Sequence, residues 1–76
     1  MREVLEYIAK SLVSDPEAVQ VTEVTNGSTV NLRLTVAPED MGKVIGKGGR
    51  TVRAIRDVVR AAATKSGVAV TVEIVE

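Results

Sequence analysis

The chain has 76 residues with ten basic and ten acidic side chains, and it contains neither cysteine nor histidine. A chain of this length can form one modest hydrophobic core, so we expect a single domain over residues 1–76. The composition excludes disulfides and the usual structural zinc sites, and no stretch approaches the roughly 20 apolar residues that span a membrane.

The first 13 residues predict an amphipathic helix. Their apolar side chains recur at the spacing that forms one buried stripe: Val4, Leu5, Ile8, Ala9 and Leu12. The helix should end at Ser14-Asp15-Pro16, because proline disfavours helical geometry at the residue before it. Since the chain opens directly into this pattern rather than into a signal peptide, we expect a cytoplasmic protein with no membrane partner.

The next segment predicts a β-hairpin with one buried face. Residues 19–25 and 30–36 alternate apolar and polar side chains, as strands do. Between them, Asn26-Gly27 is typical of a two-residue hairpin turn, in which both residues adopt positive φ. Ala37-Pro38 should close the second strand.

The remaining residues predict two helices and a final strand. A short helix is expected over residues 40–45, a longer one over 50–65 and a strand over 68–75. The order αββααβ predicts a two-layer α+β fold, with three helices covering one face of a three-stranded mixed sheet. In the longer helix, the spacing places four apolar residues on the buried side: Val52, Ile55, Val59 and Ala62.

Charge is unevenly distributed along this neutral chain. Seven basic residues and one acidic residue lie within residues 41–65, whereas the rest of the chain carries three basic and nine acidic residues. Such a layout can present a positive face to a polyanion, although a solvated helix face would show the same pattern.

Glycines interrupt this basic segment at Gly46, Gly48 and Gly49. Glycine can adopt backbone geometries closed to other residues, and it lets a phosphate chain lie against main-chain N–H groups. The spacing does not fit a Walker A loop, because three residues rather than four separate Gly42 from Gly46-Lys47. It does not fit the dinucleotide fingerprint either, because Thr51 stands where a third glycine is needed.

The run Val44-Ile45-Gly46-Lys47-Gly48-Gly49-Arg50-Thr51-Val52 resembles the KH signature, an apolar pair followed by GxxG and a further apolar residue. In KH domains this loop joins two helices and holds the backbone of about four nucleotides of single-stranded RNA. The element order is that of the type II KH fold, and the whole chain resembles the KhpA family of stand-alone bacterial KH proteins. This resemblance implies an RNA chaperone that works with a larger KH protein, KhpB, and is linked to cell elongation and cell-wall homeostasis.

The resemblance and the charges together define the candidate RNA-binding residues. They are Gly46, Lys47, Gly48, Gly49, Arg50, Lys43, Val44, Ile45 and Arg53. Val44, Ile45 and Val52 could form an aliphatic floor for bases, or could belong to the core. Arg56 and Arg60 lie further from the loop and are expected to face solvent or a partner.

Two other functions compete with RNA binding. An enzyme is disfavoured because histidine and cysteine are absent and the carboxylates are scattered, and we expect no cofactor, metal or small-molecule substrate. A protein-interaction adaptor, which dimerises or binds a second KH protein, remains open. Val58, Ala54 and Ala61 could allow close helix approach in such an assembly, although alanine is also simply a good helix former.

Overall fold

The computed structural model describes residues 2–75. Its helices and strands follow the predicted order: α1 (Arg2–Leu12), β1 (Gln20–Asn26), β2 (Thr29–Thr35), α2 (Met41–Ile45), α3 (Arg50–Thr64) and β3 (Ala69–Val75). Short 3₁₀ turns at Pro16–Ala18, Pro38–Asp40 and Lys47–Gly49 connect them. Within these residues no helix has both the length and the apolar character needed to cross a membrane.

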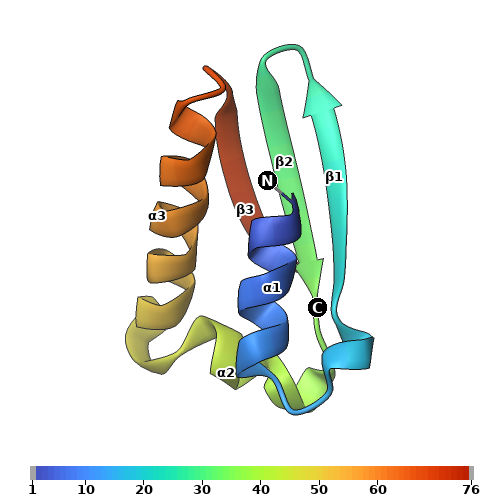
Figure 1. The fold of residues 1–76 in the computed structure, drawn as a ribbon. Helices are drawn as coiled ribbons and strands as arrows, with labels where there is room; N and C mark the ends of the chain where they lie inside the picture. The colour runs from blue at the N-terminus through green and yellow to red at the C-terminus, as the bar shows by residue number, and fades with distance from the viewer. Residues whose placement is uncertain (1, 76) are drawn as a thin grey trace.

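The sheet is mixed, as predicted. β2 lies in the centre, antiparallel to β1 and parallel to β3. Its residues alternate in burial, so that Val30, Leu32 and Leu34 point into the core while the residues between them do not. The helices lie together on this buried side (Figure 1). The fold is therefore the two-layer α+β arrangement expected from the sequence.

The core lies between the sheet and the stripes of α1 and α3. Leu5 and Ala9 of α1 are fully buried, and α3 buries Val52, Ile55, Val59 and Ala63. The sequence had predicted Ala62 in the last position, which is wrong, because Ala62 is exposed. The last turns of α3 extend beyond α1 (Figure 1), so only the side of α3 that faces the sheet is covered there.

The hairpin differs from the prediction in its turn and in the burial of β1. Asn26 pairs with Thr29, so the two-residue turn is Gly27-Ser28, and only Gly27 has positive φ. Apart from half-buried Val21, the residues of β1 are exposed. β1 forms an outer edge of the sheet (Figure 1), away from α3, and so receives little cover from the helical layer.

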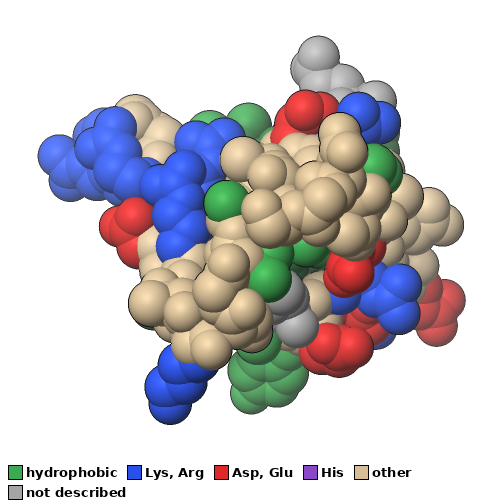
Figure 2. All heavy atoms as spheres, turned by 90° about the horizontal axis from the view of Figure 1, so that it is seen from above, with side chains coloured by type: hydrophobic (Ala, Val, Ile, Leu, Met, Phe, Trp, Pro, Cys, Tyr) green, Lys and Arg blue, Asp and Glu red, His purple; other side chains and the backbone are tan. Residues whose placement is uncertain are grey.

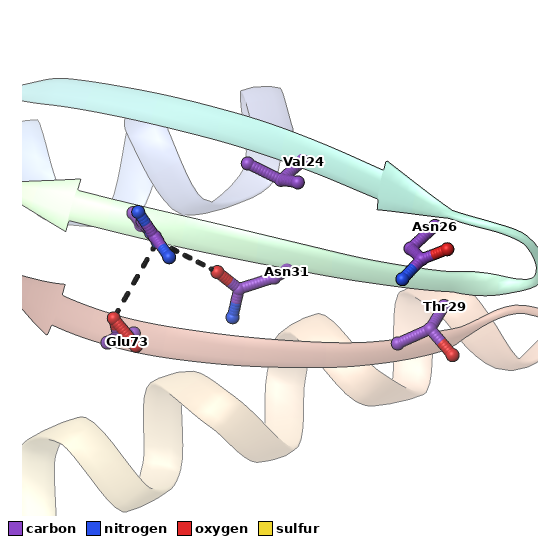
Figure 3. Close-up of a pocket in the computed structure, with 6 residues that line it drawn as sticks. Val24, Asn26, Thr29, Asn31 and Glu73 are labelled. Atoms are coloured by element: carbon purple, nitrogen blue, oxygen red, sulfur yellow. Dashed lines mark hydrogen bonds and ion pairs between the residues drawn. The ribbon is translucent and has the colours of Figure 1, made fainter.

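The face of the sheet opposite the helices is polar. Asn31 donates from Nδ2 to Thr71 Oγ1 at 2.7 Å, and its Oδ1 accepts from Arg33 Nε at 3.1 Å. Arg33 Nε also lies 3.7 Å from Glu73 Oε2. Figure 3 shows Asn31 and Glu73 projecting from neighbouring strands on this face. Because its arginine is paired with a carboxylate, this surface offers no unbalanced positive charge to an anion.

Candidate nucleic-acid interface

The glycine loop, residues 46–49, joins α2 to α3 with an unusual backbone. Gly46 has φ 75° and ψ 170°, a combination essentially restricted to glycine, and Gly48 and Gly49 have φ 66° and 78°. In residues 2–75 every residue with positive φ is a glycine. The expectation that this loop uses backbone geometries suited to glycine is confirmed: Gly46 has a combination closed to other residues, and Gly48 and Gly49 lie in the left-handed region that favours glycine.

The glycines of this loop differ in the space around them. A Cβ added to Gly46 would lie 2.1 Å from Thr51 Oγ1 and 2.9 Å from the Thr51 backbone nitrogen, far inside van der Waals contact. A Cβ on Gly48 or Gly49 would meet nothing within 4 Å. Gly46 is therefore needed for close packing onto the first turn of α3, whereas Gly48 and Gly49 leave the outer surface of the loop bare. The sequence did not indicate this role of Thr51.

Three cations surround the bare loop. Lys47 lies within it, Arg50 is the first residue of α3, and Arg53 follows one turn later; all three are exposed. None of them forms an ion pair with another residue in the range 2–75. The N-cap of α3 is Gly49, which supplies no side-chain cap, so the first N–H groups of the helix are not satisfied by a capping side chain. These donors and the helix dipole favour an anion here.

Positive charge continues along α3 beyond the loop. Seen from the end of the molecule opposite the loop, basic side chains gather on the side where α3 lies (Figure 2). This view agrees with the sequence, in which α3 carries Arg50, Arg53, Arg56 and Arg60 against the single acid Asp57. The neutral chain thus has a basic flank.

The predicted aliphatic floor is reduced to one residue. Val44 is fully buried in the core and Val52 is 8% exposed, so their side chains offer no surface to a base in this conformation. The structure therefore corrects the prediction that the Val44 side chain contacts RNA. The other possibility, that these two valines pack in the core, holds for both. Ile45 remains half-buried beside the loop and keeps a surface for an aliphatic contact.

Comparison with known proteins agrees with this geometry. Residues 2–74 match the family model described as "KhpA/KhpB, KH domain". This chain is a KH domain of the KhpA family. It is 59% identical to a Clostridium acetobutylicum protein named RNA-binding protein KhpA, over 99% of this chain and 100% of that protein. A Clostridium perfringens protein of the same name is 57% identical over the same shares.

The fold of this KH domain recurs in solved structures. It resembles part of Era, in a complex with MgGDPNP and nucleotides 1506–1542 of 16S ribosomal RNA, with a TM-score of 0.68 and 18% identity. The match covers 96% of this chain but only 28% of the Era chain. At this identity the likeness establishes the shared fold alone.

Lys43, a predicted contact residue, is already partnered in the KH domain. Its ammonium lies 3.4 Å from Asp40 Oδ1 and donates to Ser14 Oγ. Asp40 has no exposed surface, and its two carboxylate oxygens accept the backbone N–H groups of Ser14 and Asp15, each at 3.1 Å. The Ser14 N–H, foremost, together with the Asp15 N–H and Lys43, lowers the pKa of Asp40 although burial opposes this. Asp40 is therefore ionised at neutral pH.

The sequence had suggested only a helix start at Asp40, because its partners are 25 and 26 residues away in the chain. Asp40 does occupy the N-cap position of α2, but its side chain makes no capping hydrogen bond. The local sequence pattern therefore identified Asp40 as the start of a helix, but it did not reveal the hydrogen bonds that Asp40 accepts from Ser14 and Asp15.

Arg56 also departs from the prediction that it faces solvent or a partner. It is half-buried, and its Nε donates to the Val72 backbone oxygen at 3.2 Å. Because β3 is an edge strand, this carbonyl has no neighbouring strand on that side. Arg56 thus ties α3 to the edge of β3, whereas Arg60 is exposed as expected.

Proposed function

We propose that this KH domain binds single-stranded RNA through residues 46–49 and the first turn of α3. The observation that carries the proposal is the bare loop: Gly48 and Gly49 have positive φ and open space around them. Beside them lie Lys47 and Arg50, which form no ion pair within residues 2–75. The relatives named RNA-binding protein KhpA support the same ligand. In this proposal Gly46 sets the bend, the glycine backbone lies against the RNA, and Lys47, Arg50 and Arg53 neutralise phosphates.

The chemistry of the loop favours a strand over a mononucleotide. The loop joins two helices, unlike the strand-to-helix turns of the common nucleotide-binding motifs. The chain has a single aromatic residue, Tyr7, on α1, so an aromatic stacking platform of the RRM or OB-fold kind is not built. Bases would instead rest on aliphatic surface such as Ile45, with about four nucleotides held by the loop.

In the cell, we propose, the protein acts in the cytoplasm as an RNA chaperone and post-transcriptional regulator linked to cell elongation and cell-wall homeostasis. The resemblance to the KhpA family supports this role. The small number of cations at the loop supports weak, exchangeable binding, as a chaperone needs.

Salt dependence tests whether phosphates carry this binding. We expect the logarithm of the association constant for a short, labelled single-stranded RNA to fall linearly with the logarithm of salt concentration. The slope should be about −0.7 for each phosphate neutralised, or about −2 if Lys47, Arg50 and Arg53 each neutralise one. Fluorescence anisotropy between 50 and about 300 mM salt measures this slope. A slope near zero would contradict a phosphate-clamping loop.

A second candidate function, a protein-interaction adaptor, is favoured by the surface between α1 and α3. An apolar hollow there is lined by Ile8, Leu12, Thr51, Ala54, Ile55 and Val58. Val58 is 50% exposed and Leu12 38%, and both line this one hollow, so they form a contiguous apolar patch of the kind that marks interaction surfaces. A second copy of this chain, or a KhpB-like KH protein as the family model's name suggests, would cover this hollow. RNA binding and association can coexist, since the hollow shares only Thr51 with the first turn of α3 and includes neither residues 46–49 nor Arg50 and Arg53.

Sedimentation at micromolar concentration tests the adaptor. We expect the parent to associate with itself or with a second KH protein, and Val58→Asp to shift it to monomer because a buried, unpaired carboxylate is costly at an interface. Val24→Asp is the matched control, because Val24 is 46% exposed on the opposite face of the sheet. A parent that stays strictly monomeric and ignores a second KH protein, or equal effects of both variants, would refute the adaptor.

A further inference from the structure

α2 is too short to hold its own position. It has five residues, Met41–Ile45, and isolated helices of this length are unstable in water. Its place therefore depends on contacts with the rest of the molecule. Val44 and Met41, which pack in and against the core, provide some of these contacts, and the buried carboxylate of Asp40 at the start of α2 provides another.

The Asp40 contact reaches across the fold to a connection near the loop. Asp40 accepts both of its backbone hydrogen bonds from Ser14 and Asp15, in the segment between α1 and β1. Lys43 closes the cluster by contacting Asp40 and Ser14 together. The glycine loop begins three residues after Lys43, at Gly46, whose N–H bonds back to the Gly42 oxygen at 2.8 Å. A shift of α2 would therefore move the loop directly.

We propose that Asp40 and Lys43 form a positioning pair that holds α2, and with it residues 46–49, in the conformation that receives RNA. Lys43 then raises RNA affinity through Asp40 and does not contact a phosphate. The proposal rests on the proposed RNA-binding function of the loop.

Charge balance explains why the ammonium stays with Asp40. The carboxylate has no exposed surface, and Lys43 is the one cation paired with it among residues 2–75. Moving Lys43 onto a phosphate would leave a buried negative charge with backbone donors alone, which is unfavourable. Lys47, by contrast, is exposed and forms no ion pair with another of the described residues, so contact with a phosphate breaks no ion pair among them.

RNA binding against salt separates positioning from phosphate contact. We expect Lys43→Met to weaken binding roughly three- to tenfold at every salt concentration, in the range by which indirect residues change a remote site, with the slope of the parent. Lys47→Met should instead make the slope less negative by about 0.7. Lys43→Arg keeps the cation beside Asp40 and should restore parental affinity. RNA binding is measured well below the melting temperature of each variant, so that unfolding does not contribute to the loss of affinity.

The loop itself provides a readout that needs no RNA. In ¹H–¹⁵N spectra of the free protein, Asp40→Asn and Lys43→Met should both shift the amide resonances of Gly46, Gly48 and Gly49. Gly27 and Gly67, which also have positive φ but lie away from the loop in the hairpin turn and after α3, serve as internal controls and should not shift.

Three results would overturn the positioning pair: a slope reduced by Lys43→Met as much as by Lys47→Met, parental affinity in Lys43→Met, or unshifted loop glycines. If the parent itself bound no RNA, the proposed function would fail, while the spectra would still decide whether the pair positions the loop.

Discussion

The double variant Lys47→Asp/Gly48→Asp should bind single-stranded RNA at least roughly a hundredfold more weakly than the parent while keeping its fold. Each unit charge pair about 4 Å apart in water contributes about 1 kcal/mol, and every 1.4 kcal/mol changes affinity tenfold. The variant replaces the attraction at Lys47 by repulsion and adds a second carboxylate at the loop surface. Anisotropy titration measures the affinity.

The fold should survive because the substituted side chains have room. Lys47 is exposed, and a Cβ at Gly48 meets nothing within 4 Å. Gly48 has φ 66°, which costs an aspartate about 1 kcal/mol, since aspartate tolerates the left-handed region better than most residues. The far-UV spectrum should be unchanged and the melting temperature should fall only modestly.

The other end of α3 offers a matched control. Lys65→Asp/Gly67→Asp makes the same two replacements, with the same change in net charge, at a glycine of φ 67° that also has open space around it. This variant should retain most of the RNA affinity. If both double variants lost binding equally, the loss would reflect total charge, and if the Lys47→Asp/Gly48→Asp protein bound like the parent, the loop assignment would be wrong.

Gly46→Ala should produce the largest loss of stability among single changes in the loop, about 2 to 4 kcal/mol. Two penalties combine: the backbone combination at Gly46 costs a non-glycine residue about 1 to 3 kcal/mol, and the new Cβ would overlap Thr51. Because the Thr51 backbone nitrogen is one of the clashing atoms, rotation of the Thr51 side chain cannot relieve the contact. Urea denaturation measures the free energy of unfolding, and RNA affinity should fall with the displaced loop.

Two other glycines calibrate this effect. Gly48→Ala has positive φ but open space, so it should cost about 1 kcal/mol. Gly42→Ala lies within α2, without positive φ and without a neighbour in reach, so it should be neutral or stabilise by up to about 1 kcal/mol. A Gly46→Ala protein as stable as the Gly48→Ala protein would show that the contact with Thr51 does not constrain the loop.

Much of the fold was predictable because it depends on neighbours in the chain. The period of apolar residues in residues 1–13 and 50–65, and the glycines between the two later helices, encode local geometry directly. Errors arose where the cover over an element mattered. β1 alternates like a half-buried strand, yet it lies at the sheet edge and is mostly exposed. Ala62 is exposed and belongs to the last turn of α3, the part of this helix that extends past α1 (Figure 1).

The candidate site divides in the same way. Sequence alone determined the order of elements, the glycine loop and the cations Lys47, Arg50 and Arg53 beside it, because backbone freedom and charge belong to the residues themselves. Only the tertiary structure decided that Val44 lies in the core, that Arg56 hydrogen-bonds to the edge strand β3 and that Lys43 forms an ion pair with Asp40. Those roles depend on atoms brought together from distant parts of the chain, and packing between layers, not local pattern, determines which polar groups meet.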